Sequence, residues 1–306
     1  MAQAQSLVRP GWLPKESQRE ALAGYLFILP TFLGYTAFIV GPILAAIGIS
    51  FTKYDILTPA TFVGLDNYIR LLSDPRLRTV YGNTIFFTVF AVTLNVGLGL
   101  LLAVLLNRHL PGPVKYVLRS AYFFPVLVAL VYSSIIWQFL YQKDTGILNY
   151  YLGLLNVAPI PWLSNRQWVL PSIIILDVWR NAGFAMLVFL AGLQNISQEY
   201  YEAAQLDGAN RLQLFRHITV PLISPTIFFN LIIYMIGALQ VFDSIMVLTK
   251  GGPGDASRSL VIYIYENAFQ FFEMGYASAV AITLFVIIVS LTLIQFRLGR
   301  AWVHYG

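Results

Sequence analysis

The chain has 306 residues, of which 58% belong to the hydrophobic types and only 11% are charged, and its formal net charge is +5. Soluble domains carry about 25% charged residues, so this composition excludes an ordinary water-soluble globule of the same size. The basic residues form no run, which argues against a nucleic-acid partner. The absence of cysteine excludes disulfides, iron–sulfur clusters and thiolate zinc sites.

Long apolar segments predict an all-α integral membrane protein in contact with lipid. Each segment exceeds the roughly 20 residues that a helix needs to cross about 30 Å of hydrocarbon, and a helix satisfies its own backbone hydrogen bonds there. Residues 1–20 are polar and predict a tail. The apolar stretch after them is too long for a signal peptide, so it is expected to remain as the first span. The six predicted spans cover residues 21–50, 82–107, 117–140, 171–194, 222–248 and 276–298.

One short loop predicts the orientation of these spans. Residues 107–120 contain Arg108, Lys115 and Arg119 and no acidic residue, and loops of this kind stay on the cytoplasmic side of a membrane. Six spans then place both termini in the cytoplasm, together with the tail 1–20 and the segment 195–221.

The segment 195–221, between the fourth and fifth predicted spans, predicts a helix–turn–helix. Ser197 is a favourable N-cap, and Asp207-Gly208 ends the first helix because glycine adopts the left-handed conformation at low cost. A second short helix is expected from about Asn210 to Ile218, after which Pro221 begins the fifth span. These features alone fit an ordinary amphipathic connection equally well.

The order of residues in this segment resembles the EAA loop of ABC importer permeases. The match runs from Glu202-Ala203-Ala204 through Gly208 to Ile218-x-Val220-Pro221 and departs only at Val220, where the family usually has leucine. In that family the loop is cytoplasmic and docks on the ATPase subunit. The resemblance therefore implies a coupling role for Glu202, Ala203, Ala204, Asp207, Gly208, Phe215, Ile218 and Pro221.

Two further stretches, 63–68 and 241–254 with 275–279, are similar to carbohydrate permeases of the maltose and glycerol-3-phosphate type. The resemblance implies that 21–306 is the permease domain of a bacterial inner-membrane importer for a sugar, polyol or glycerol-phosphate solute. It also implies partners: a second homologous permease subunit, two ATPase subunits that hold ATP and Mg, and an extracytoplasmic solute-binding protein. This chain itself is expected to bind no cofactor and to have no catalytic residue.

Ionisable residues inside the predicted spans indicate a solute path. Asp177, Arg180 and Asp243 are costly in hydrocarbon and usually face a bundle interior or a water-filled route. One interpretation is a self-neutralising Asp177–Arg180 pair at i,i+3. The other is a polar mouth at the outer side of the membrane, to which hydrogen-bonding and stacking groups would contribute. The residues expected on this path are Asp177, Arg180, Asn181, Tyr234, Gln240 and Asp243.

Other functions find less support in the residues. Gly251-Gly-Pro-Gly254 lacks the lysine of a phosphate-binding loop and predicts an outer turn. His109, His217 and His304 have no nearby second ligand, so no metal site is expected, and no nucleophile motif indicates an intramembrane hydrolase. An ion-coupled secondary transporter of a small polar solute is the alternative, although it would have no ATPase to engage.

Overall fold

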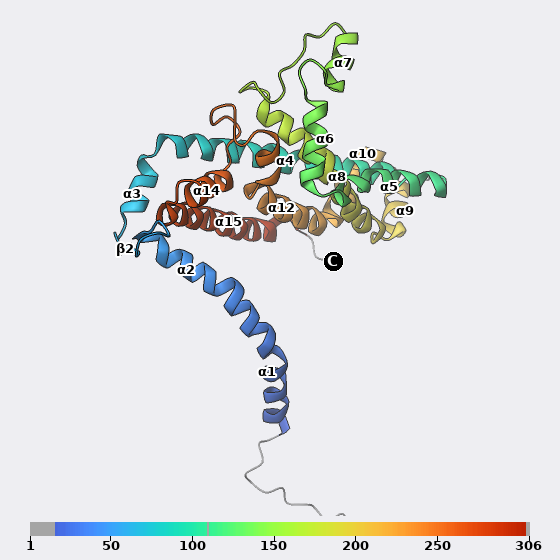
Figure 1. Cartoon of the computed structure of the whole chain (residues 1–306). Coiled ribbons are helices and arrows are strands. Elements are labelled where there is room, and N and C mark those ends of the chain that lie inside the picture. The colour runs from blue at the N-terminus through green and yellow to red at the C-terminus, as the bar shows by residue number, and fades with distance from the viewer. Residues whose placement is uncertain (1–15, 109, 304–306) are drawn as a thin grey trace, which may run out of the picture.

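The computed structural model describes residues 16–108 and 110–303, which are almost entirely helical (Figure 1). Residues 1–15 of the predicted tail, His109 and His304 lie outside the described residues. In chain order the elements are α1 Glu16–Tyr35, the π-helix η1 Thr36–Val40, α2 Gly41–Ser50, β1 Thr52–Lys53, β2 Thr61–Phe62, α3 Asp66–Ser73, α4 Pro75–Leu106, α5 Gly112–Leu127, α6 Leu130–Leu140, α7 Ile147–Leu154, α8 Val169–Gln194, α9 Gln198–Leu206, α10 Arg211–Leu214, the π-helix η2 Phe215–Thr219, α11 Val220–Leu222, α12 Ser224–Leu239, α13 Asp243–Leu248, α14 Leu260–Phe269 and α15 Met274–Trp302.

Four helical segments in the described part of the chain are long and apolar enough to cross a membrane without a sharp bend: Gln18–Ser50, Pro75–Leu106, Val169–Gln194 and Met274–Trp302. Two further pairs pass the same test only when the helices on both sides of a sharp bend are combined. By length and composition the chain therefore has four to six spans. The all-α membrane architecture is confirmed, and the count of six stays a prediction.

The prediction of one helix over 117–140 is wrong. α5 ends at Leu127, α6 begins at Leu130, and the two helices meet at 100°. Val128 and Ala129 between them are extended, with ψ angles of 129° and 135°. Pro125 in the last turn of α5 has no backbone N–H, which weakens the helix at this point. Apolar composition predicts how many residues lie in the membrane, but it cannot show whether the helix they form is bent.

The prediction of one helix over 222–248 is also wrong. α12 ends at Leu239, residues 240–242 are not helical, and α13 begins at Asp243. Pro221 does not begin this span, because it lies in α11, and the helical run Arg211–Leu222 is bent by 66° from α12. Both α11 and α12 carry a proline in their first turn, where its missing N–H costs nothing. Because both helices begin with a proline, the prolines in the sequence could not show whether the span begins at α11 or at α12.

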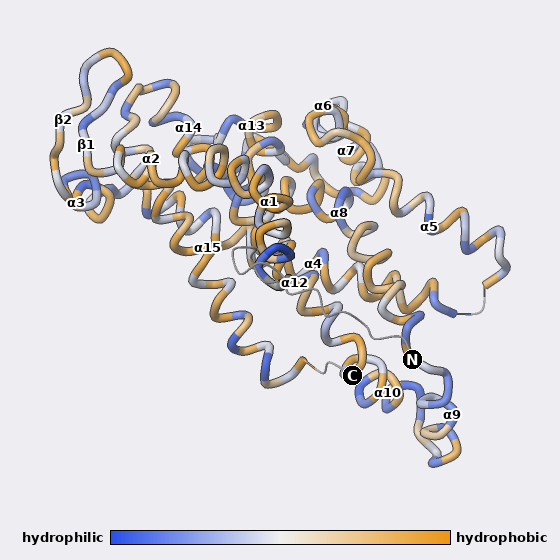
Figure 2. The backbone as a smooth tube through the Cα atoms, turned by 90° about the horizontal axis from the view of Figure 1, so that it is seen from below, coloured by the Kyte–Doolittle hydropathy of each residue, from blue (hydrophilic) through white to orange (hydrophobic). Residues whose placement is uncertain are grey.

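α8 lies at the centre of the bundle and packs against α4 and α5, while α12 packs against both α4 and α8. Phe87 of α4 and Ile173, Met186 and Phe189 of α8 are at most 1% exposed. The sequential helices α9 and α10 lie at the end of the molecule away from α3, β1 and β2 (Figure 2). The core thus separates the predicted coupling segment from the loops at the other end.

The first helical segment, from Gln18 to Ser50, extends away from the rest of the chain (Figure 1). Its most apolar stretch has no buried residue, and only the α2 end is held by the body of the protein. The Asn67 side chain donates to the Ser50 and Thr52 carbonyl oxygens, both at 2.9 Å. β1 then pairs with β2 in an antiparallel register of Thr52 with Phe62 and Lys53 with Thr61.

Charged residues join the start of α4 to the loop between α13 and α14. Arg258 donates to both carboxylate oxygens of Glu266, at 2.8 and 2.9 Å, and also pairs with Asp255. Arg76 at the start of α4 contacts the same Asp255 at 3.1 Å. Gly251 and Gly254 in this loop have positive φ angles of 85° and 61°, which glycine adopts at low cost. The loop is therefore an ordered structural element.

Candidate functional site

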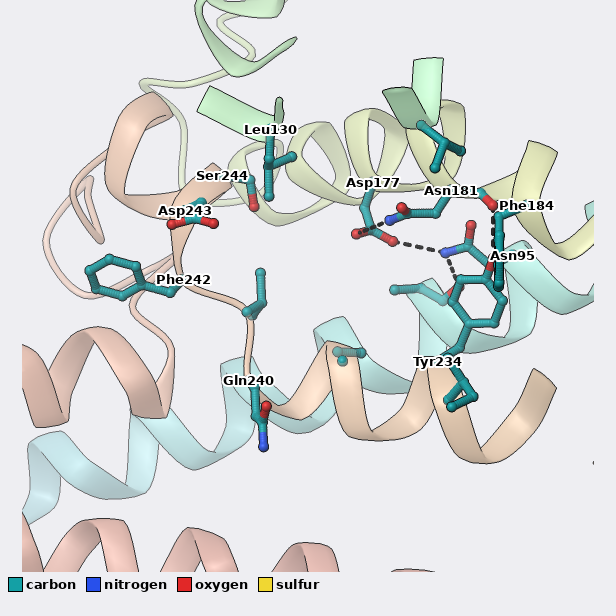
Figure 3. A pocket seen from close by; sticks show the side chains of 16 residues that line it. Asn95, Leu130, Asp177, Asn181, Phe184, Tyr234, Gln240, Phe242, Asp243 and Ser244 are labelled. Atoms are coloured by element: carbon teal, nitrogen blue, oxygen red, sulfur yellow. Dashed lines mark hydrogen bonds between the residues drawn. The ribbon is translucent and has the colours of Figure 1, made fainter. Parts of the chain in front are cut away.

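A cavity of about 480 Å³ lies between α4, α8, α12 and α13 (Figure 3). Its size is typical of small-molecule sites. Five of the six residues predicted for a solute path line this cavity: Asp177, Asn181, Tyr234, Gln240 and Asp243. The structure thus gathers side chains that are up to 66 positions apart in the sequence, from 177 to 243.

Asp177 on α8 is the centre of a cluster of amide and carboxylate groups. Its Oδ2 accepts from Asn95 Nδ2 of α4 at 2.8 Å, and its Oδ1 accepts from Asn181 Nδ2, one helical turn further along α8, at 2.9 Å. Asn95 also donates to the Ala91 carbonyl oxygen at 2.9 Å. A buried carboxylate is tolerated when hydrogen bonds replace its lost water. These bonds therefore explain how α8 carries an aspartate inside the bundle.

Tyr234 closes the α12 side of the cavity. Its hydroxyl donates to the Asn181 carbonyl oxygen at 2.7 Å and so ties α12 to α8. The hydroxyl is thus engaged with backbone, and the ring is the part of Tyr234 that remains available to the cavity. Phe184 of α8 adds a second aromatic ring to the lining.

The break between α12 and α13 supplies the remaining polar groups. Gln240 and Asp243 are exposed, and within the described residues neither side chain makes a hydrogen bond or an ion pair. Figure 3 shows the Gln240 side chain pointing away from the Asp177 cluster, whereas Asp243 and Ser244 lie at the α13 edge of the cavity. A continuous helix through 222–248 could not have turned the chain across the cavity in this way.

Arg180 does not line the cavity and does not form the i,i+3 pair with Asp177. Its guanidinium donates to the Val126 and Val128 carbonyl oxygens at 3.4 and 3.5 Å, and to Asn181 Oδ1 at 3.0 Å. Those carbonyl oxygens lie where α5 ends, and a cation is favoured at a helix C-terminus. Among the described residues no direct hydrogen bond or ion pair joins Arg180 to Asp177, and both side chains bond other groups.

Sequence reasoning missed Asn95, Phe184 and Ser244. Asn95 is the informative omission, since it is fully buried in α4 and bonds Asp177 directly. Its signal was present: it is an amide in an otherwise apolar stretch, and a buried polar group needs a partner. The described residues hold no group of three or more His, Asp or Glu placed to bind a metal ion.

The segment between α8 and α12 begins with two capped helices. Ser197 accepts from the Glu199 backbone N–H at the start of α9, and Asn210 forms a capping box with Gln213 at the start of α10. Gly208 between them has φ of 83°, and a Cβ there would meet no atom within 4 Å. Leu206 and Leu212 are 89% and 73% exposed. The turn therefore presents apolar side chains outward.

The fold and the cavity define a multi-pass helical membrane protein whose interrupted helices border a polar site, an arrangement typical of solute carriers. Residues 95–304 match the family described as binding-protein-dependent transport system inner membrane component, and the chain belongs to this family.

Named relatives and a solved structure agree with this membership. The chain is 38% identical over 293 residues to the probable ABC transporter permease protein YesP of Bacillus subtilis, covering 94% of each chain. It is 38% identical over 287 residues to the trehalose/maltose transport system permease protein MalF of Thermococcus litoralis, covering 94% of this chain and 96% of that one. A crystal structure of a bacterial ABC transporter involved in the import of the acidic polysaccharide alginate matches with a TM-score of 0.81 and 25% identity, covering 94% of this chain and 98% of that one.

The predicted family is therefore confirmed. The chain is a multi-pass permease subunit of an ABC importer, and it is a transport component as distinct from the ATPase.

Proposed function

We propose that this permease moves a sugar or a related solute into the cytoplasm through the cavity around Asp177. The observation that carries the proposal is the convergence of Asp177, Asn181, Tyr234 and Asp243 on one cavity between interrupted helices. Carboxylate and amide groups bond hydroxyls, and the Tyr234 and Phe184 rings offer apolar faces to the C–H face of a sugar ring. The printed names of the sugar-transporting relatives support the same class of solute.

In our proposal, ATP hydrolysis on the partner subunits supplies the energy for this movement. The turn between α9 and α10, with Glu202, Ala203, Ala204, Asp207, Gly208 and Phe215 around it, docks on an ATPase subunit that holds ATP and Mg. The exposed Leu206 and Leu212 support this role, because exposed apolar side chains gathered at one place indicate a contact surface. A second permease subunit, a second ATPase and an extracytoplasmic binding protein complete the assembly.

Reconstitution tests the transport function. The assembled importer is placed in vesicles with its binding protein, and uptake of labelled maltose, a monosaccharide, a polyol and glycerol 3-phosphate is measured with and without ATP. Uptake of at least one of these compounds should require both ATP and the binding protein. Uptake that follows an ion gradient and ignores ATP would support the secondary-transporter alternative instead.

Cysteine labelling tests the orientation, which places both termini inside. Thiols introduced by Pro111→Cys and Asn210→Cys should be shielded from a membrane-impermeant reagent in intact cells. Leu155→Cys should react, because Leu155 is 73% exposed in the loop between α7 and α8, on the proposed outer side. Reaction of the Asn210→Cys thiol from outside would contradict both the orientation and the docking role.

A further inference from the structure

The charged groups that line the cavity are acidic, whereas a site that holds an anion needs basic groups. We propose that the cavity has a negative potential and accepts an uncharged polyhydroxylated solute while rejecting anions such as sugar phosphates and uronates. This inference rests on the proposed role of the cavity as the solute path. It narrows the solutes considered above by excluding the glycerol phosphates.

The lining itself supplies only acidic charge. Asp177 and Asp243 are the charged side chains among its described residues, and none of these residues is lysine, arginine or histidine. Both oxygens of Asp177 accept from amide N–H donors, the pattern of an ionised carboxylate, which is an acceptor only. A site for phosphate or carboxylate is normally built from arginine, lysine or backbone N–H groups. Cationic donors are missing from the described lining, and the free backbone N–H groups at the start of α13 lie next to the Asp243 carboxylate.

Asp243 contributes the more accessible of the two charges. It is exposed at the first residue of α13, and no described side chain neutralises it. An anion that enters the cavity therefore meets an unpaired carboxylate at the α13 edge. In a cavity with apolar walls the repulsion between like charges is screened less than in water.

Arg180 is the basic residue next to the cavity on α8, and its geometry explains why it does not make the potential of the cavity positive. Its guanidinium is turned towards the Val126 and Val128 carbonyl oxygens at the end of α5. The partial negative charge of a helix C-terminus offsets a cation placed there. Its contact with the cavity is indirect and runs through Asn181 Oδ1. Asn181 in turn donates one N–H of its side-chain amide to Asp177, so the cavity side of Arg180 is separated from an anion by an amide that already serves the Asp177 carboxylate.

A buried acceptor without a partner points to hydroxyl donors. Asn95 Oδ1 has no hydrogen-bond partner among the described residues, although the Asn95 side chain is fully buried beside the cavity. Leaving a buried acceptor unpaired costs about 1–3 kcal/mol. A solute with many O–H groups can donate to this oxygen and to Asp243. A phosphate or carboxylate offers further acceptors where acceptors are already in excess.

Charged thiol reagents measure the potential directly in the assembled importer. The chain has no cysteine, so Gly237→Cys introduces one thiol into it. Gly237 lines the cavity and is exposed, and a Cβ there meets no atom within 4 Å. The matched control is Gly153→Cys on α7, which is also exposed and open at its Cβ. Two methanethiosulfonate reagents are compared, one with a cationic trimethylammonium group and one with an anionic sulfonate group. The rate at which each modifies the thiol is followed by the increase in mass of this chain.

We expect the cation-to-anion rate ratio of the Gly237→Cys thiol to exceed that of the Gly153→Cys control by about fivefold or more. Adding Asp243→Asn should bring the ratio towards the control, and salt at about 1 M should reduce it because the Debye length falls to about 3 Å. A ratio at or below the control, or one that Asp243→Asn leaves unchanged, overturns the proposal. If Gly237→Cys does not assemble, Ile233→Cys replaces it, since Ile233 lines the same cavity and is 43% exposed.

Maltose uptake separates this inference from the proposed function. Loss of ATP-dependent uptake of every compound tested, with the high rate ratio intact, would contradict transport and leave the negative potential established. ATP-dependent uptake with a rate ratio below the control would support transport and contradict the negative potential. Uptake of glycerol 3-phosphate as fast as maltose in the wild-type vesicles also overturns the exclusion of anions.

Discussion

A Cβ on Gly183 of α8 would lie 1.9 Å from the Tyr122 carbonyl oxygen of α5. On the α4 side of α8 the contact is also tight, because a Cβ on Gly99 would lie 2.4 Å from the Ala185 Cβ. Small residues at such positions allow membrane helices to approach closely. The two glycines therefore set how near α5 and α4 lie to the helix that carries Asp177.

Gly183→Ala should destabilise the protein, because the added methyl group can be accommodated only if α5 moves away from α8. Overpacking of this kind costs about 1–3 kcal/mol. Gly97→Ala is the matched control, since a Cβ at Gly97 meets no atom within 4 Å. Thermal unfolding of the purified importer should show a lower midpoint for Gly183→Ala alone. Equal midpoints for the two variants would mean that the α5–α8 contact is looser than described.

Asp177→Asn and Asp243→Asn should both slow solute uptake, but for different reasons. Asn at 177 keeps one oxygen, so one of the Asn95 and Asn181 amides loses its acceptor. A buried donor left unpaired costs about 1–3 kcal/mol, and a lower unfolding midpoint is expected as well. Asp243 has no bonded partner among the described residues, so Asp243→Asn should leave the midpoint unchanged. Uptake kinetics and unfolding of both variants check this, and wild-type uptake in both would remove them from the path.

Gly208→Val should weaken the association with the ATPase, because a β-branched residue is strained at φ of 83°. Gly208→Asn is the matched variant, since asparagine tolerates the left-handed region better, and it should retain more of the association. Glu202→Lys reverses an exposed charge on α9 and should also weaken it. The readout is co-purification of the ATPase with solute-stimulated ATP hydrolysis. Full retention in Gly208→Val and Glu202→Lys would contradict the docking role.

Arg258→Met should cost far more stability than Arg70→Met. The Arg258–Glu266 side chains are each 10% exposed, whereas those of the Arg70–Glu273 pair are 49% and 41% exposed. Removing one partner of a buried pair costs about 3–5 kcal/mol, and an exposed pair contributes about 0–1 kcal/mol. The double variant Arg258→Met/Glu266→Gln should recover part of the loss. Similar unfolding midpoints for Arg258→Met and Arg70→Met would refute this ranking.

Asp74 predicts a pH dependence of stability outside the spans. Partial burial opposes its ionisation, but hydrogen bonds from Tyr263, Tyr276 and the N–H groups of Arg76 and Leu77 outweigh this and lower its pKa below the ordinary value of 3.8. Because the folded pKa is the lower one, the stabilisation is present at neutral pH and is lost as the pH falls through it. The difference in unfolding midpoint between wild type and Asp74→Asn should therefore shrink below pH 3.8. A difference that grows towards acid pH would contradict this assignment.

The positions of the helices were predicted well where an apolar segment forms one uninterrupted helix. The span 171–194 corresponds to α8 within two residues at its start, and 276–298 lies inside α15. Hydropathy failed where the chain bends, at Val128–Ala129 and at residues 240–242, because a bent apolar segment has the same composition as a straight one. The start of α4 was placed seven residues late, since the N-cap Asp74, which accepts from two backbone N–H groups, lies in a charged stretch that looks like a loop.

The site was predictable where a residue is costly in lipid by itself. Asp177 and Asp243 are of this kind, and both line the cavity. Their partners were not predictable, because Asn95 and Asp177 are 82 positions apart and only the packing of α4 on α8 brings them together. Arg180 was placed on the path for its charge alone. Which way its side chain turns depends on the break between α5 and α6, and this break was itself unpredicted.

The hydrogen bond from Asn95 to Asp177 has a mechanical consequence. It crosses the α4–α8 interface at the level of the cavity, and the same interface is closed by Gly99 against Ala185. A transport cycle that separated these two helices would break a partly buried amide–carboxylate bond in every turnover. α4 and α8 are therefore expected to move as one rigid wall, and access to the solute changes at the interrupted helices opposite it.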